Sequence, residues 1–106
     1  MYRQGDVLIV PIAEDAAVAE RWQPAPRDRR GRMVLALGEV TGHAHAISSP
    51  GTLFHDPHTP SSTVLHLPEG GRVVHEEHAA IGLPKGWYRV VRQREYIPGA
   101  VRLVAD

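Results

Sequence analysis

The sequence predicts an all-β fold, a small antiparallel β-barrel or sandwich with at most one short helix. Short runs rich in Val, Ile, Leu and Tyr recur along the chain, Pro/Gly turns separate them, and only one stretch has a helix-forming composition. About eight short strands joined by such turns are typical of antiparallel barrels and sandwiches. With 106 residues the chain is expected to form a single domain.

The N-terminal part contains two predicted strands and the helix candidate. Tyr2–Ile12 holds the aliphatic run Val7–Val10, which is typical of a strand covered on both faces. Pro11 has no N–H, so this strand should end there or lie at a sheet edge. Ala13–Trp22 is rich in Ala and Glu, and both a short helix and an irregular crossing remain open for it. Met33–Leu37 is again strand-like.

The rest of the chain alternates strand-like runs with Pro/Gly turns. The predicted strands are Ser62–Leu67, Arg72–Glu76, Ala79–Leu83, Trp87–Ile97 and Val101–Val104. If the turns between them close simple hairpins, cross-strand partners share a face. Val64 then pairs with His75, Glu77 faces Arg92, and His75 faces Arg94. This register predicts one face that carries histidine, carboxylate and arginine together.

Composition excludes several classes of protein. The formal charge is zero, with twelve basic and twelve acidic residues, which argues against a protein that coats nucleic acid. Cysteine is absent, so disulfides, thiolate metal ligands and cysteine nucleophiles are excluded. Because the chain shows neither a membrane-spanning apolar run nor a signal-like N-terminus, we expect a cytoplasmic protein without membrane contact.

The histidines are the chemically informative residues. The chain has seven, and four of them fall into two clusters, His43-Ala44-His45 and His75-Glu76-Glu77-His78. In a strand, residues two apart point to the same face, so His43 and His45 would project side by side. If Ser49–Thr52 closes a simple hairpin, His45 pairs with Asp56, whose carboxylate would orient the imidazole.

The first functional hypothesis is a site for a divalent transition metal, Zn, Fe, Mn or Ni. Its ligands would be His43, His45, His75 and His78, with Glu77 as a further carboxylate. The His-x-His element resembles the opening of the cupin metal motif, in which a His pair, a Glu and a later His bind Fe, Mn, Ni or Zn inside a β-barrel. The chain departs from that motif, because no Glu follows His45 at the expected spacing and no His follows Pro84-Lys85-Gly86.

The second hypothesis is a metal-independent enzyme. His43, His45 and His75 would act as general acid and base and Glu77 would orient them. Arg92 and Arg94 would bind a small-molecule or polymeric anion, for example the phosphodiester of RNA. The proposed catalytic residues are therefore His43, His45, His75, Glu77, Arg92 and Arg94. A non-catalytic interaction module is the third class. Exposed sheet edges favour a homodimer in any of the three.

Three blocks of the chain carry a wider resemblance. They read Gly-Glu-Val-Thr-Gly-His-Ala-His-Ala-Ile at residues 38–47, His-Glu-Glu-His at 75–78 and Gln-Arg-Glu-Tyr at 93–96. Together they resemble small bacterial β-proteins without an established function. The resemblance implies a shared fold and site over most of the chain from Tyr2, and it implies no activity.

Overall fold

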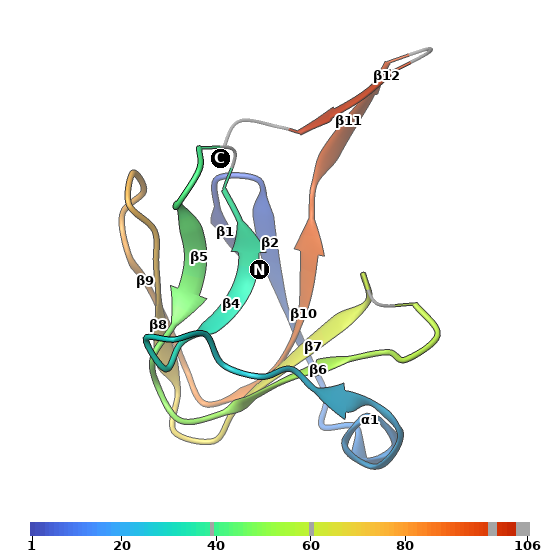
Figure 1. Ribbon diagram of the computed structural model, residues 1–106. Coiled ribbons are helices and arrows are strands. Elements are labelled where there is room, and N and C mark those ends of the chain that lie inside the picture. Colours follow the sequence, from blue (N-terminus) through green and yellow to red (C-terminus); the bar gives the residue numbers. More distant parts are fainter. Residues whose placement is uncertain (39, 60, 98–99, 104–106) are drawn as a thin grey trace.

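A computed structural model describes residues 1–38, 40–59, 61–97 and 100–103, with side chains as far as Gln93 (Figure 1). These residues form twelve strands and one helix, which confirms the all-β prediction and the short helix. Within this described part the strands form two larger antiparallel sheets and one separate hairpin, without a closed barrel, so the architecture is a sandwich. In the described part of the chain, no helix is long and apolar enough to cross a membrane.

The larger sheet has the order β1-β2-β10-β7-β6-β3. Its strands are β1 (Tyr2–Gln4), β2 (Val7–Ile12), β10 (Gly86–Arg92), β7 (Thr63–Leu67), β6 (Thr52–His55) and β3 (Gln23–Pro24). The N-terminal run is therefore two strands joined through Gly5 and Asp6, where Gly5 supplies the positive φ of +58°. Pro11 lies inside β2 opposite Tyr88, beyond the last pair that β2 makes with β1 at Ile9, so its missing N–H faces an open edge.

The smaller sheet has the order β4-β5-β8-β9. Its strands are β4 (Met33–Leu37), β5 (Ala44–Ile47), β8 (Gly71–Val74) and β9 (Ile81–Leu83). All four residues of β5 are buried, since this strand has neighbours on both edges and packs into the sandwich. A bulge in β4 between Val34 and Ala36 shifts the register of β4 against β5 and places Ala36 opposite His45.

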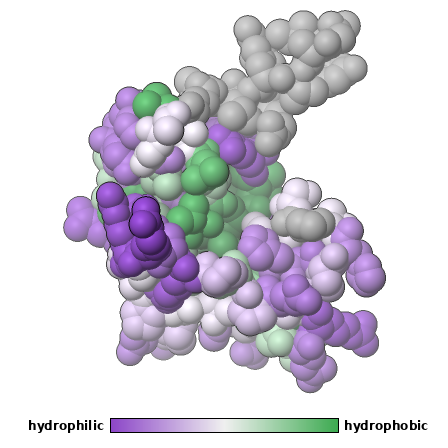
Figure 2. All heavy atoms as spheres, in the orientation of Figure 1, coloured by the Kyte–Doolittle hydropathy of each residue, from purple (hydrophilic) through white to green (hydrophobic). Residues whose placement is uncertain are grey.

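The main hydrophobic core lies between the two sheets. Its buried side chains come from both of them: Val7, Ile9, Met33, Leu35, Ile47, Leu53, Leu65, Leu67, Val73, Leu83, Tyr88 and Val90. Each fully buried aliphatic side chain of this kind stabilises the fold by about 1.5–3 kcal/mol. Figure 2 shows that hydrophobic residues also gather in a hollow in the middle of the face drawn, with hydrophilic residues around it.

A smaller cluster covers the other face of the larger sheet. The helix α1 (Ala16–Arg21) begins at Asp15, whose side chain accepts a hydrogen bond from the Ala17 N–H at 3.0 Å. The helix contributes Val18, which packs with Phe54 and Val64 and with the half-buried Trp22. Packing against the sheet stabilises a helix too short to persist alone.

The predicted hairpin register is wrong at three turns. β7 pairs with β6 and β10, whereas β8 pairs with β5 and β9, so the turn between them crosses from one sheet to the other. The chain crosses again between β5 and β6 and between β9 and β10. A Pro/Gly turn looks the same in sequence whether it closes a hairpin or joins two sheets. In a sandwich, crossing lets both strands turn apolar side chains toward one core.

These crossings change the predicted partners. Val64 lies opposite Arg89 and Phe54, and not opposite His75. Arg92 lies opposite Val7 in β2, so it does not face Glu77.

Two further register predictions are affected. His45 lies opposite Ala36 in the smaller sheet, and not opposite Asp56. The last strands, β11 (Arg94–Ile97) and β12 (Ala100–Leu103), pair with each other, so the predicted pairing of Arg94 with His75 is also wrong. In Figure 1 this hairpin projects from the two sheets.

Candidate metal centre

The segment before β5 and β5 itself position the first histidine pair. His45 lies within β5 and is fully buried, whereas His43 precedes the strand and its side chain is 21% exposed. Gly42, with φ +87°, turns the chain into this segment, and the His43 N–H donates to the Val40 carbonyl at 3.0 Å. The two imidazoles therefore enter the site from neighbouring positions, one in the sheet and one just outside it.

The connection between β8 and β9 supplies the second cluster. His75 is buried, His78 is half-buried, and Glu76 and Glu77 are exposed. Because β8 pairs with β5, the residues that follow β8 lie beside the start of β5. This pairing brings the two histidine clusters together although about thirty residues separate them in the chain.

His75 lies at the centre of the four histidines. Its ring centroid is 4.3 Å from that of His45, 4.8 Å from that of His78 and 5.6 Å from that of His43. The His45 and His78 rings are stacked at 6.1 Å. The structure thus brings together the four histidines predicted as metal ligands, and the ring of His75 is near each of the other three.

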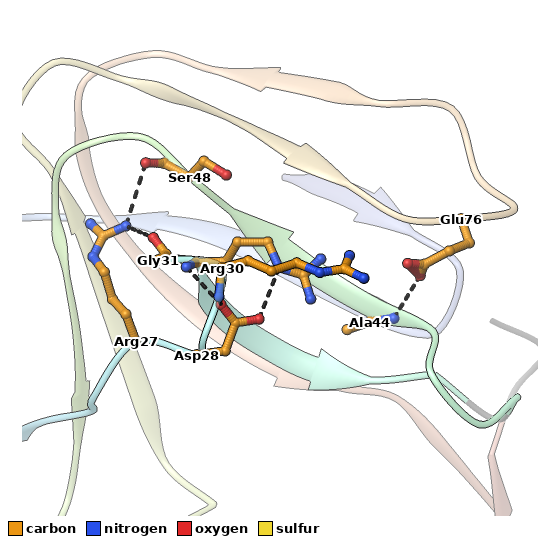
Figure 3. Close-up of polar contacts among 8 residues, drawn as sticks. Arg27, Asp28, Arg30, Gly31, Ala44, Ser48 and Glu76 are labelled. Atoms are coloured by element: carbon orange, nitrogen blue, oxygen red, sulfur yellow. Dashed lines mark hydrogen bonds and ion pairs between the residues drawn. The ribbon is translucent and has the colours of Figure 1, made fainter.

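Glu76 joins this group through the backbone of β5. Its Oε1 accepts a hydrogen bond from the Ala44 N–H at 2.8 Å (Figure 3). This bond, assisted by the neighbouring His43 and His75, holds the pKa of the Glu76 carboxyl below its usual value. One potential ligand atom from each of His43, His75 and Glu76 lies within 4.8 Å of the other two.

His45 is held from both sides of its ring. The orientation of the Gln4 side-chain amide is fixed because its Nε2 donates to the carbonyls of Val73 and Ala79, at 3.2 Å and 3.0 Å. Its Oε1 therefore faces His45 Nδ1, at 2.8 Å, and this ring nitrogen must be the donor. The other ring nitrogen, Nε2, lies 3.6 Å from Oδ1 of the fully buried Asp6.

Arg92 balances the charge of Asp6. Its Nε donates to Asp6 Oδ2 at 2.7 Å, and the Asp6 carbonyl accepts from the Gln93 N–H at 2.7 Å. A buried carboxylate requires such compensation. Arg92 therefore reaches the site through Asp6, behind His45, and not beside Glu77 as the hairpin register predicts.

The acidic neighbours of His43 and His75 have distinct contacts. Glu77 Oε1 lies 3.7 Å from His43 Nδ1, and the Glu77 N–H donates to His75 Nδ1 at 3.0 Å. Within the described residues, His43 Nδ1 and His78 Nε2 are buried ring nitrogens without a hydrogen bond. Buried polar atoms of this kind usually have a partner, so these two nitrogens are candidates for binding a ligand.

The side chain of Arg94, a predicted anion ligand at the start of β11, is outside the described residues. Two histidines that were not predicted as site residues lie on the larger sheet and in a loop. His66 stacks on Trp87 with centroids 4.3 Å apart, and His58 is exposed in the loop after β6. Sequence reasoning missed Gln4, Asp6 and Glu76 as members of the site. Glu76 sits inside the His-Glu-Glu-His cluster, but the false hairpin register turns it to the opposite face.

The fold and this cluster define a β-sandwich protein with a partly buried histidine–carboxylate cluster, to which both sheets contribute residues. The chain belongs to the family described as Domain of unknown function (DUF8820), whose profile matches residues 3–93. The matched segment contains every described side chain of the site. No curated protein matches the chain, and no solved structure does.

Proposed function

We propose that the protein binds one divalent transition metal ion through His43, His75 and Glu76. The observation that supports this proposal is the approach of their potential ligand atoms, each within 4.8 Å of the other two. Two imidazoles and a carboxylate form a ligand set suited to Zn, Fe, Mn or Ni. Since cysteine is absent, nitrogen and oxygen ligands are what the chain can offer.

The spacing suits a metal after small side-chain rotations. A four-coordinate ion with bonds of about 2.0–2.1 Å holds its ligand atoms roughly 3.4 Å apart. Glu76 uses Oε1 for the Ala44 N–H, which leaves its other carboxylate oxygen for the ion. Three protein ligands leave coordination positions open, and an ion held in this way could polarise a substrate or activate a water.

The remaining histidines have different parts in the proposed centre. His78 is a candidate fourth ligand, because its buried Nε2 has no hydrogen bond among the described residues and its ring lies 4.8 Å from that of His75. His45 packs at 4.3 Å from His75 while Gln4 occupies its Nδ1. We therefore infer that His45 supports His75 and that it is not among the three principal ligands.

The Glu77 amide offers a reporter of metal binding. Its N–H donates to His75 Nδ1 at 3.0 Å, so an ion bound through Nδ1 would replace this N–H as the partner of the ring. The amide resonance of Glu77 should then move on addition of metal, together with those of Ala44 and Glu76.

Two measurements test the proposal on protein purified without a histidine tag. The first is metal analysis, and the second is calorimetric titration with Zn²⁺, Ni²⁺, Mn²⁺ and Fe²⁺. We expect one ion per chain, with affinity reduced at least tenfold in His43→Ala, His75→Ala and Glu76→Gln. His58→Ala is the matched control, since His58 is exposed away from the cluster. A folded protein with no affinity for any of the four ions would disprove the metal site.

A metal-independent acid–base role for the same histidines makes the opposite prediction. The contact that favours it is the 3.7 Å approach of Glu77 Oε1 to His43 Nδ1, an arrangement that can orient an acid–base imidazole. It requires activity on an anionic substrate, such as RNA, that resists chelators and disappears in His75→Ala. If every histidine could be replaced while a protein partner still bound, the interaction module would be favoured instead.

A further inference from the structure

A second candidate site lies on the larger sheet, apart from the histidine cluster's ligands. A cleft of about 540 Å³ is bounded by Trp22 after α1, by Ser61, Ser62 and Thr63 at the start of β7, and by Arg89 and Arg92 of β10. Its volume falls within the range of about 300–1,000 Å³ found for small-molecule sites. The argument for a ligand rests on the charge and shape of these walls.

The cleft presents positive charge without an acidic side chain among its lining residues. It contains two arginines, three hydroxyl groups and no carboxylate. Arg92 is already neutralised in part by Asp6, to which its Nε donates at 2.7 Å. Arg89 is exposed and therefore carries most of the available charge.

The neighbours of Arg89 in the sheet are apolar. Its cross-strand partners are Val10 in β2 and Val64 in β7. The residues two positions away in β10, which share its face, are Trp87 and Val91. None of these can form the cross-strand or same-strand ion pair that usually balances an arginine in a sheet. A guanidinium in such surroundings is suited to bind an anion from solution.

The other walls favour a ligand with a flat part beside its charge. Trp22 packs against the cluster of Val18, Phe54 and Val64, so its indole is held in place at the cleft. A planar group can stack on such a ring. Thr63 Oγ1 donates to the Val90 carbonyl at 3.3 Å, which leaves Ser61 and Ser62 as the hydroxyl donors to a ligand.

We propose that this cleft binds a small organic anion, a carboxylate or phosphate attached to a planar group. Arg89 holds the anionic group, Ser61 and Ser62 donate hydrogen bonds to it, and Trp22 contacts the planar group. The cleft contains none of the proposed metal ligands, and Arg92 is the one lining residue that also contacts the histidine site, through Asp6.

Titration of ¹⁵N-labelled full-length protein with phenyl phosphate, benzoate, inorganic phosphate and phenol tests the proposal. We expect shifts in the amide resonances of residues 61–63 and 89–92. At least one of the two aromatic anions should bind more tightly than both inorganic phosphate and phenol. Arg89→Gln should weaken that binding at least tenfold, and Arg89→Lys should weaken it less because the charge remains.

Arg72→Gln is the matched control, since Arg72 is exposed on β8 in the other sheet. It should leave the affinity unchanged. The proposal is overturned if neither aromatic anion shifts these resonances, or if phenol binds as well as the anions. It is also overturned if Arg89→Gln, shown to be folded by its thermal unfolding, binds the anions as tightly as the unchanged protein does. None of these results depends on whether metal binds.

Discussion

Gln4 connects parts of the molecule that are far apart in sequence. Its side-chain amide meets His45, Val73 and Ala79, which lie 41, 69 and 75 residues away in the chain. Its exposed fraction is 2%, so water cannot replace these contacts. A single buried amide thus joins β1 to both chain segments that form the histidine cluster, and it decides which nitrogen of His45 carries a proton.

Gln4→Leu should therefore destabilise the protein strongly. The substitution keeps the approximate volume of the side chain but leaves His45 Nδ1 and the two carbonyls without their partner. Unsatisfied buried groups cost about 1–3 kcal/mol each, so we expect the free energy of unfolding to fall by about 2–4 kcal/mol. Urea denaturation at neutral pH measures this change. Gln23→Leu, at an exposed position of β3, is the control and should change stability by less than about 0.5 kcal/mol.

The carboxyl group of Glu76 should make stability depend on pH. Its pKa in the folded protein is lowered from 4.5 by the Ala44 N–H, so the ionised form is favoured on folding. The stabilisation is complete above the unfolded-state value and is lost as the pH falls through the folded-state value. Unfolding followed from pH 6 downward should show a smaller loss of stability in Glu76→Gln than in the unchanged protein. Identical curves for the two proteins would contradict the role of the Ala44 bond.

At the scale of elements, local sequence patterns predicted where strands form better than they predicted which strands pair. The aliphatic runs at Val7–Val10 and Met33–Leu37 form strands, as predicted. Their apolar side chains have to be buried whichever strand becomes their neighbour, so the local pattern is enough to predict them. The choice of partner depends on which sheet a strand joins after each turn. That choice is made by packing of the whole core, which explains why Val64 was assigned to His75 and is found opposite Arg89 and Phe54.

The turn between β7 and β8 shows what a sheet crossing requires. Gly70 has φ +77°, its N–H donates to the Leu67 carbonyl at 3.3 Å, and a Cβ added there would lie 2.8 Å from the Leu83 carbonyl oxygen. Backbone and space both favour glycine at this position. The crossing turn is therefore packed against the end of β9, which a simple hairpin would not require.

Gly70→Ala should consequently lower the free energy of unfolding by about 1–3 kcal/mol, the usual cost of a left-handed backbone at a residue other than glycine. Gly82→Ala is a sharp control within the same sheet, since a Cβ there would meet nothing within 4 Å. Chemical denaturation of the two variants should separate them clearly. Equal stabilities would show that the crossing turn adapts without strain.

At the scale of the whole molecule, the site exists only when the sandwich is assembled. The turn after β1, the segment before β5, the connection after β8 and the end of β10 each contribute one part of it. The sequence showed that His43, His45, His75 and His78 were candidates because histidine clusters are unusual. It could not show Gln4 or Asp6, because residues of these types are mostly exposed and the importance of these two comes from their burial.

The C-terminal hairpin should be dispensable for this assembly. β11 pairs with β12, and the family match ends at residue 93. The side chains described up to Gln93 already join both sheets in one core. A two-stranded hairpin by itself is marginally stable in water. A chain that ends at Gln93 keeps the N–H that donates to the Asp6 carbonyl at 2.7 Å.

We expect this shorter chain to unfold cooperatively, with a midpoint within about 4–8 °C of that of the full chain, which corresponds to roughly 1 kcal/mol. Calorimetry measures the midpoint, and light scattering on both chains measures whether either of them forms a homodimer. Loss of cooperative unfolding in the shorter chain would instead assign the hairpin a part in the core.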